Sequence, residues 1–291
     1  MNRKALWLLI VFSFLGVAGV KAQSNQAVQI QVRPAASESD IECSGFFSRT
    51  PIRDDLQLVN GADNDFLDPL HQFVPGDDVY LWAYVGSGPA IGSEWRLVRP
   101  ASENVAHAWG RSGLGGLYGF DYTRHYSGQT AGMSAMGVPY EDVGRVKVVR
   151  NALNGFVAQV ISTCGAINPG DIAIPYEPRP VPTYAPAALD RFGHSSGLRG
   201  VIAAMPDNRT IMGPGGIAYI NLGQQKNVKP GDRFRILRNL QIGNSPHSTP
   251  ELPLETVGEL VVLWTQAKSS VGVVVSTHRG VDLGDIVEGE D

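Results

Sequence analysis

Short alternations of apolar and polar residues recur along this chain and predict β-strands. Residues 94–97 and residues 233–236 alternate with the period of two that a half-buried strand requires. Pro-Gly and Gly-Asp pairs precede several such segments and favour tight turns. The chain holds 34 glycines and 19 prolines, and long helical patterns are few. We therefore expect an all-β protein with many turns.

The sequence contains an internal duplication. Two blocks recur at an offset of 139 (214 − 75), and three further blocks recur at an offset of 114 (257 − 143). The matched pairs are 75–81 with 214–220, 92–99 with 231–238, 143–149 with 257–263, 160–163 with 274–277 and 170–172 with 284–286. The offsets differ by 25 (139 − 114), which indicates an insertion in the first copy between residues 99 and 143. Matching blocks in a constant order predict a duplicated domain.

Each copy reads as a small barrel. Strands starting at residues 45–47 and 200–202 complete about five short strands per copy, which suits a closed SH3-like barrel better than a sandwich. Arg96 and Arg235 occupy equivalent polar positions and are predicted to face away from the core.

The duplication defines the domain organisation. We expect a signal peptide over residues 1–22, a flexible segment over 23–40, a first barrel over 41–175, a linker over 176–197 and a second barrel over 198–288. The first barrel carries an aromatic and glycine-rich insertion over 100–142. Prolines at 175, 178, 180 and 182 predict an extended, semi-rigid linker between the copies.

The first residues have the pattern of a secretory signal. Arg3 and Lys4 precede an apolar run that is short for a membrane span, and Ala22 ends a small-x-small cleavage motif. Export without a remaining membrane span, to the periplasm or cell envelope, is expected. Removal of three basic residues leaves 21 (24 − 3) against 28 acidic ones, a net charge of −7, which argues against nucleic acid as a partner.

Cys43 and Cys164 are the two cysteines of the chain. In an oxidising compartment a disulfide between them is the natural interpretation, and two buried thiols are the alternative.

The stretch GHSSG at residues 193–197 matches the G-x-S-x-G of a serine-hydrolase nucleophile elbow. That motif needs a strand before Ser195 and a helix after it, whereas a proline-rich linker precedes it and a β-branched apolar segment follows. No catalytic residues, metal site or cofactor are expected, because no histidine pair, HExxH motif or cysteine cluster has ligand spacing.

The insertion offers a candidate binding surface. Trp109, Tyr122 and Tyr126 stand among many glycines, and aromatic rings on loops provide large contact area at low entropic cost. The alternative is that these rings cover the open end of the barrel.

The second copy resembles a known module. Residues 218–223 and 227–234, Gly258-Glu259-Leu260 and Gly284-Asp285-Ile286 resemble the C-terminal domain of flagellar assembly protein T over residues 198–288. The pattern is similar to that of uncharacterised exported envelope proteins, some of which carry peptidoglycan-binding LysM modules. The resemblance implies an SH3-like fold and an envelope setting, and it brings no catalytic residues.

We therefore expect a non-catalytic envelope scaffold that contacts another envelope protein or peptidoglycan, through the insertion or the cleft between the copies. The alternatives are a flagellar basal-body assembly component and an envelope hydrolase whose site has no familiar motif.

Overall fold

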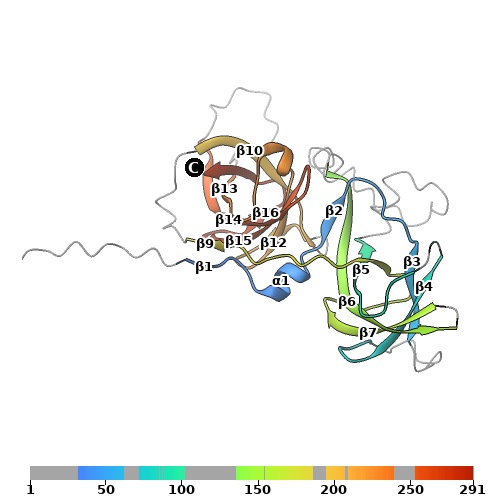
Figure 1. Ribbon diagram of the computed structural model, residues 1–291. Helices are drawn as coiled ribbons and strands as arrows, with labels where there is room; N and C mark the ends of the chain where they lie inside the picture. The colour runs from blue at the N-terminus through green and yellow to red at the C-terminus, as the bar shows by residue number, and fades with distance from the viewer. Residues whose placement is uncertain are drawn as a thin grey trace, which may run out of the picture. The chain divides into compact units, whose positions relative to one another are not determined.

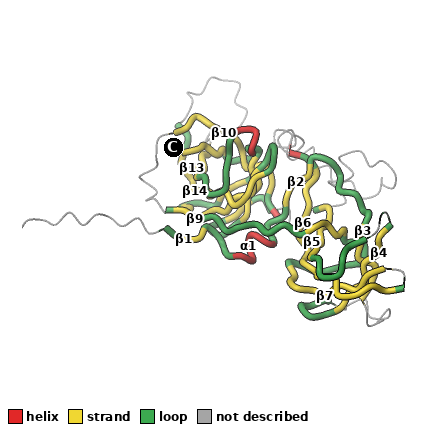
Figure 2. Tube along the Cα trace, viewed as in Figure 1, coloured by secondary structure: helices red, strands yellow, loops and turns green. Residues whose placement is uncertain are grey.

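A computed structural model describes residues 32–61, 72–84, 86, 88–101, 136–153, 155–185, 195–206, 209–238 and 253–290 (Figure 1). The chain from Val32 to Asp291 forms one compact unit. Strands dominate it, as the yellow segments of Figure 2 show. No helix within these ranges is long and apolar enough to cross a membrane.

The first barrel closes from six strands. They are β3 (Leu56–Gly61), β4 (Asp78–Ala83), β5 (Glu94–Pro100), β6 (Val138–Ala152), β7 (Gly155–Thr163) and β8 (Ile172–Pro175). Their order is β6-β5-β8-β3-β4-β7, and β7 pairs back with β6 to close the sheet. Closure removes the free edges that an open sheet would expose.

The second barrel repeats this arrangement. Its strands are β10 (Ser195–Ala204), β12 (Ile217–Ile220), β13 (Arg233–Arg238), β14 (Glu255–Thr265), β15 (Ser270–Thr277) and β17 (Ile286–Glu290). Their closed order, β14-β13-β17-β10-β12-β15, matches the first barrel strand for strand. The prediction of two related small barrels is confirmed.

The register of the strands follows the offsets read from the sequence. Glu94 pairs with Lys147 in the first barrel, and Arg233 (94 + 139) pairs with Val261 (147 + 114) in the second. The bulge in β5 lies between Leu97 and Val98, and the bulge in β13 lies at the equivalent step. Because a bulge bends its strand, its recurrence gives both barrels the same curvature at this point.

An arginine-aspartate clamp is also duplicated. Arg99 makes a bidentate contact to Asp171, with Nε–Oδ1 and Nη2–Oδ2 distances of 2.7 and 2.9 Å. Arg238 binds Asp285 in the same way at 2.8 and 2.6 Å. In each copy the carboxylate also accepts a backbone N–H three residues earlier, from Asn168 or Asp282. The Gly-Asp motif therefore closes a turn and anchors the strand beside it.

Each barrel has its own core. Leu58, Leu81 and Leu97 belong to a cluster inside the first barrel, and Ile202, Phe234 and Leu260 belong to one inside the second. These side chains come from the inward positions of alternating strands, as the period of two requires.

One expectation about the first copy is wrong, and the environment of a second predicted residue, Arg96, differs from that of an ordinary outward position. The strand near residues 45–47, β2 (Phe46–Ser48), pairs only with β6 and stands outside the barrel, whose first strand is β3. Arg96 does point out of the barrel, but only 3% of its surface is exposed. It is covered by residues distant in sequence, which an alternation pattern does not reveal.

Part of the segment predicted to be flexible has regular structure. β1 (Arg33–Pro34) pairs with β9 (Thr183–Tyr184), and α1 (Glu38–Glu42) follows it. Ser37 caps α1 by accepting the backbone N–H of Asp40, whose carboxylate accepts the Ser37 N–H in return.

Three short elements complete the second half: β11 (Ile211–Met212), the 3₁₀ turn η2 (Gln224–Lys226) and β16 (Val281–Asp282).

A fragment of residues 184–291 should fold, because the second barrel closes on itself around its own core. It should be less stable than the whole chain, because Val261, Leu263 and Val273 on its outer face would lose the residues that cover them. Circular dichroism during thermal unfolding would test this. A fragment that unfolds without cooperativity would contradict the independence of the second barrel.

Candidate functional site: the junction of the two barrels

The structure tests some of the predictions about individual residues and leaves others open. Cys43 and Cys164 form a disulfide, as predicted. Trp109, Tyr122 and Tyr126 lie outside the described residues, so their role stays a prediction. In the part of the chain that the structure describes, no group of three histidine, cysteine or acidic side chains could hold a metal ion.

Ser195 does not stand on a nucleophile elbow. It is the first residue of β10, which continues to Ala204, so a strand follows where the elbow needs a helix. Its side-chain oxygen accepts the backbone N–H of Gly197 at 3.1 Å, and the residue helps to lower the pKa of Glu288 on the neighbouring strand β17. The segment after Ser195 is thus a strand, as its β-branched apolar residues predicted.

Glu288 forms ion pairs with two arginines on the outer face of the second barrel. Arg199 and Arg235 bind its two carboxylate oxygens at 2.7 and 2.9 Å. Burial alone would raise the pKa of Glu288, but the hydrogen bonds from Arg199 and Ser195, with the charges of both arginines, hold it below its usual value. These groups stabilise the barrel by pairing with one another.

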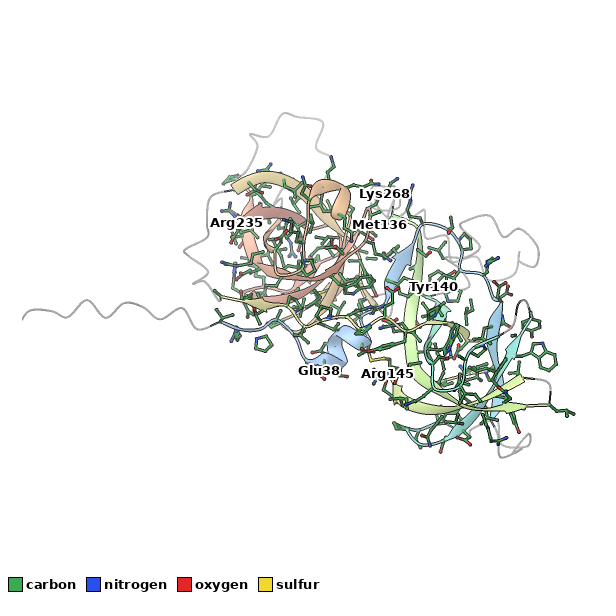
Figure 3. The ribbon with its side chains drawn as sticks, in the orientation of Figure 1. Glu38, Met136, Tyr140, Arg145, Arg235 and Lys268 are labelled. Carbon is green, nitrogen blue, oxygen red and sulfur yellow. A yellow bond between two sulfur atoms is a disulfide. The ribbon has the colours of Figure 1, made fainter. Side chains whose placement is uncertain are left out.

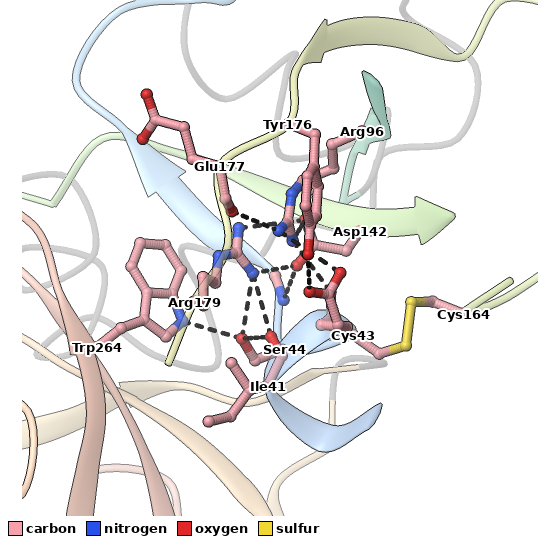
Figure 4. A network of polar contacts seen from close by, with 12 residues as sticks. Ile41, Cys43, Ser44, Arg96, Asp142, Cys164, Tyr176, Glu177, Arg179 and Trp264 are labelled. Carbon is pink, nitrogen blue, oxygen red and sulfur yellow. Dashed lines mark hydrogen bonds and ion pairs between the residues drawn. A yellow bond between two sulfur atoms is a disulfide. The ribbon is translucent and has the colours of Figure 1, made fainter. Parts of the chain in front are cut away.

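The junction between the barrels is built around Asp142 on β6 (Figure 4). Only 1% of its side chain is exposed, and two guanidinium groups neutralise it. Arg179 from the linker lies 2.5 Å from Oδ2, and Arg96 from β5 lies 3.2 Å from Oδ1. The backbone N–H of Gly45 donates to the same carboxylate at 2.9 Å. One buried side chain thus joins the first barrel, the linker and the segment before β2.

Ser44 connects this junction to the second barrel through two hydrogen bonds. Its backbone carbonyl accepts the Tyr219 hydroxyl at 2.7 Å, and its hydroxyl oxygen accepts the indole N–H of Trp264 at 2.9 Å. Gly45 has a φ of +65°, and a Cβ there would lie 2.4 Å from the Tyr219 hydroxyl. Only glycine permits this approach of the two barrels.

Arg179 also contacts the second barrel directly. Its guanidinium carbon stands 4.2 Å from the centroid of a Trp264 ring and 5.7 Å from that of Phe46. Burial lowers the pKa of Arg179, and the charge of Asp142 opposes this effect only in part. A cation held between a carboxylate and two aromatic rings is well suited to a largely dry interface.

On the other side, Tyr176 covers Arg96. The guanidinium carbons of Arg96 and Arg145 lie 5.2 and 4.6 Å from its ring centroid, and its hydroxyl donates to Glu42 at 2.5 Å. Burial, followed by the hydrogen bond to Glu42 and the charge of that residue, raises the pKa of Tyr176. The proline-rich linker is therefore packed onto the first barrel over this stretch. The disulfide at Cys43 anchors α1 to the residue after β7 at the same place.

Apolar contacts surround the polar centre. Phe47 and Met136 pack on Ala203 and Tyr219, while Ile41 and Tyr184 pack on Val261 and Leu263. Met136 therefore contributes to a cluster made largely by second-barrel residues (Figure 3). The outer face of β12, β14 and β15 is apolar because these contacts bury it.

A cleft of about 650 Å³ opens beside the junction. Phe46 and Trp264 supply its aromatic wall, Pro175 and Pro178 supply another side, and Arg49 is an exposed cation at its edge. Gln266 lines the cleft and accepts the backbone N–H of Phe47 at 3.1 Å, in place of a neighbouring strand. The arrangement can hold an extended polar ligand with an apolar face.

The sequence reading missed Asp142, Arg179 and Trp264. One sign was available: Asp142 corresponds to Thr256 (142 + 114) in the second copy, so an acidic residue appears where the fold itself does not need one. Arg179 lies in a proline-rich stretch, where a single basic residue gives no periodic signal. The cleft between the copies was anticipated as a binding surface, but its lining residues were not.

Comparison with known proteins adds no further information. No protein-family model matches the chain, and a search of curated proteins found no similar sequence.

Glu288→Gln should reduce the free energy of unfolding at pH 7 by about 1.5–3 kcal/mol, the usual contribution of hydrogen bonds to a charged group. Because the folded-state pKa is depressed, this stabilisation is present above the unfolded-state pKa and is lost as pH falls through the folded one. The difference between variant and wild type should therefore shrink between neutral pH and pH ~3. Denaturant unfolding at both pH values measures it, with exposed Asp54→Asn as the control. A difference that persists at low pH would contradict the assignment.

Asp142→Asn should destabilise the chain by about 3–5 kcal/mol, because it removes the counter-charge that two buried guanidinium groups share and leaves Arg96 only its longer contact to Glu42 at 3.7 Å. The matched control is Asp55→Asn, which breaks the exposed pair with Arg53 and should cost no more than about 1 kcal/mol. Urea unfolding of both variants gives the comparison. Equal costs would show that the junction does not depend on the buried carboxylate.

Proposed function

We propose that this protein is a non-catalytic scaffold of the cell envelope, exported across the inner membrane, that binds peptidoglycan or another envelope protein. The observation that carries the proposal is the cleft between the barrels, where aromatic, cationic and amide groups converge on one preformed surface. The disulfide supports export, because such bonds persist in oxidising compartments.

The chemistry of the described charged groups favours binding over catalysis. Asp142, the buried carboxylate of the junction, is held by two arginines and a backbone N–H. Ser195, the serine of the GHSSG motif, accepts the backbone N–H of Gly197, and two arginines pair with the carboxylate of Glu288 on the adjacent strand. These groups are committed to structural pairing.

A flagellar assembly role is the second candidate. It rests on the turn and strand motifs of residues 198–288, which resemble flagellar assembly protein T, and on the duplicated Gly-Asp turns that those motifs form here. Deletion of the gene would test it, because a basal-body component should leave cells unable to swim. Normal swimming would exclude this candidate.

The main test is co-sedimentation of the mature chain with purified peptidoglycan sacculi at low salt. The protein should pellet, and Arg49→Ala should weaken binding roughly fivefold, which corresponds to about 1 kcal/mol, by removing the cation that faces acidic groups of the wall. Arg279→Ala, an exposed arginine outside the cleft lining, is the matched control. Trp109→Ala and Tyr122→Ala would test the insertion in the same assay.

Protein that stays in the supernatant would rule out wall binding. Crosslinking in the periplasm would then be used to find a protein partner. Equal pelleting of the wild type and Arg49→Ala would remove the cleft from the binding surface.

A further inference from the structure

Exposed apolar side chains gather on one end of the first barrel. Among the described residues, nine large hydrophobic side chains are exposed, and seven of them lie between the start of β3 and the end of β8. Trp82 and Tyr84 are 38% and 59% exposed at the end of β4, Ile91 is 61% exposed before β5, and Leu153 is 99% exposed in the turn after β6. Clusters of this kind on a protein surface mark interaction sites.

The second barrel shows that the fold does not need these rings. At an offset of 139, Trp82 corresponds to Asn221 and Tyr84 to Gly223. Asn221 accepts the backbone N–H of Val201 at 2.8 Å, and a Cβ on Gly223 would lie 2.3 Å from the carbonyl oxygen of Gln266. The same strand end thus closes with a small and a polar residue. Two exposed aromatic side chains in the first copy therefore call for a role outside folding.

The two rings form an open, accessible surface. Their centroids lie 6.5 Å apart and their planes meet at 57°. Gly155 on β7 lies beside Trp82, and it pairs with Ala152 on β6. The β7 side of the indole is therefore free of side-chain bulk, while Gln57 on β3 is the residue paired with Trp82 on its other side. A hollow of about 630 Å³ adjoins on the side of Ile91 and Asn151, and one of about 380 Å³ lies towards Arg53 and Asp55.

The charges at this end indicate the class of ligand. Arg53 and Asp55 form an ion pair at 3.0 Å and neutralise each other, and two further exposed side chains of opposite charge, Asp54 and Arg150, lie at this end. An anionic lipid surface would require an excess of cations, which this end lacks. A paired arginine and aspartate, with Asn151 opposite, offers both donors and acceptors without net charge. Sugar hydroxyls need both, and the C–H faces of a sugar ring carry partial positive charge that suits the negative face of an aromatic ring.

We propose that Trp82 and Tyr84 form a stacking surface for the glycan strands of the cell wall, separate from the inter-barrel cleft, with Asn151 and the Arg53–Asp55 pair as polar neighbours. The inference rests on the proposed wall-binding function and names the part of the wall that this end recognises. Rigid aromatic side chains suit such contacts, because few rotatable bonds are lost on binding.

The test measures binding of the mature chain to intact sacculi and to glycan strands freed of their stem peptides by an amidase. Trp82→Ala and Tyr84→Ala should each weaken binding to both about tenfold. Ile211→Ala, which removes an apolar side chain of similar exposure from the second barrel, should leave binding unchanged. Thermal unfolding of each variant shows whether it is folded, and Tyr84, just past the end of β4, keeps the test valid if Trp82→Ala does not fold.

The outcomes separate this inference from the proposed function. Pelleting of the wild type with sacculi, together with wild-type affinity of both aromatic variants, would overturn the inference and leave wall binding in place. Binding to sacculi but not to free glycan strands would also overturn it, because the stem peptide would then be the ligand. A wild type that binds neither intact sacculi nor free glycan strands would overturn the proposed wall binding itself.

Discussion

The carboxylate of Asp142 is the interaction on which the junction of the two barrels depends. A buried carboxylate destabilises the fold unless other groups pair with it. Arg96 and Arg179 form ion pairs with Asp142, and the backbone N–H of Gly45 donates a hydrogen bond to it. Those partners come from β5, the linker and the segment before β2. The partners of this one carboxylate therefore fix the positions of three segments. Ser44, next to Gly45, hydrogen-bonds to Tyr219 and Trp264 and so links the same junction to the second barrel. The disulfide at Cys43 holds the neighbouring residue in the same place.

Duplication supplied the barrels, and divergence of their outer faces made the junction possible. Ile217, Val261 and Val273 of the second copy correspond to Asp78, Lys147 and Gln159 of the first. The apolar set packs against residues of α1, β2 and the linker, whereas Lys147 and Gln159 of the polar set are exposed and Asp78 is half-buried. Since each barrel closes around its own core, these outward positions could change without loss of the fold.

The sequence predicted what local patterns determine. Alternation at residues 94–97 and 233–236 located β5 and β13, and constant offsets predicted equivalent strands, because strand period and turn chemistry are local properties. The fate of Arg96 could not be predicted in this way. Its alternation correctly placed it outside the barrel, but its burial depends on Glu42, Tyr176 and Asp142, from three separate segments. β2 was placed in the barrel for a related reason, since pairing partners are not a local property.

The differences between the copies are more informative about function than their common motifs. The shared Arg-Asp clamps, bulges and turn glycines recur because both barrels need them to close. Binding residues need appear only once, and Asp142 and Trp82 lack a counterpart of the same type, because Thr256 and Asn221 occupy the equivalent positions. Asp142 holds the barrels together, so its uniqueness is explained by assembly. Trp82 has an exposed ring beside that of Tyr84, so its uniqueness is best explained by a ligand.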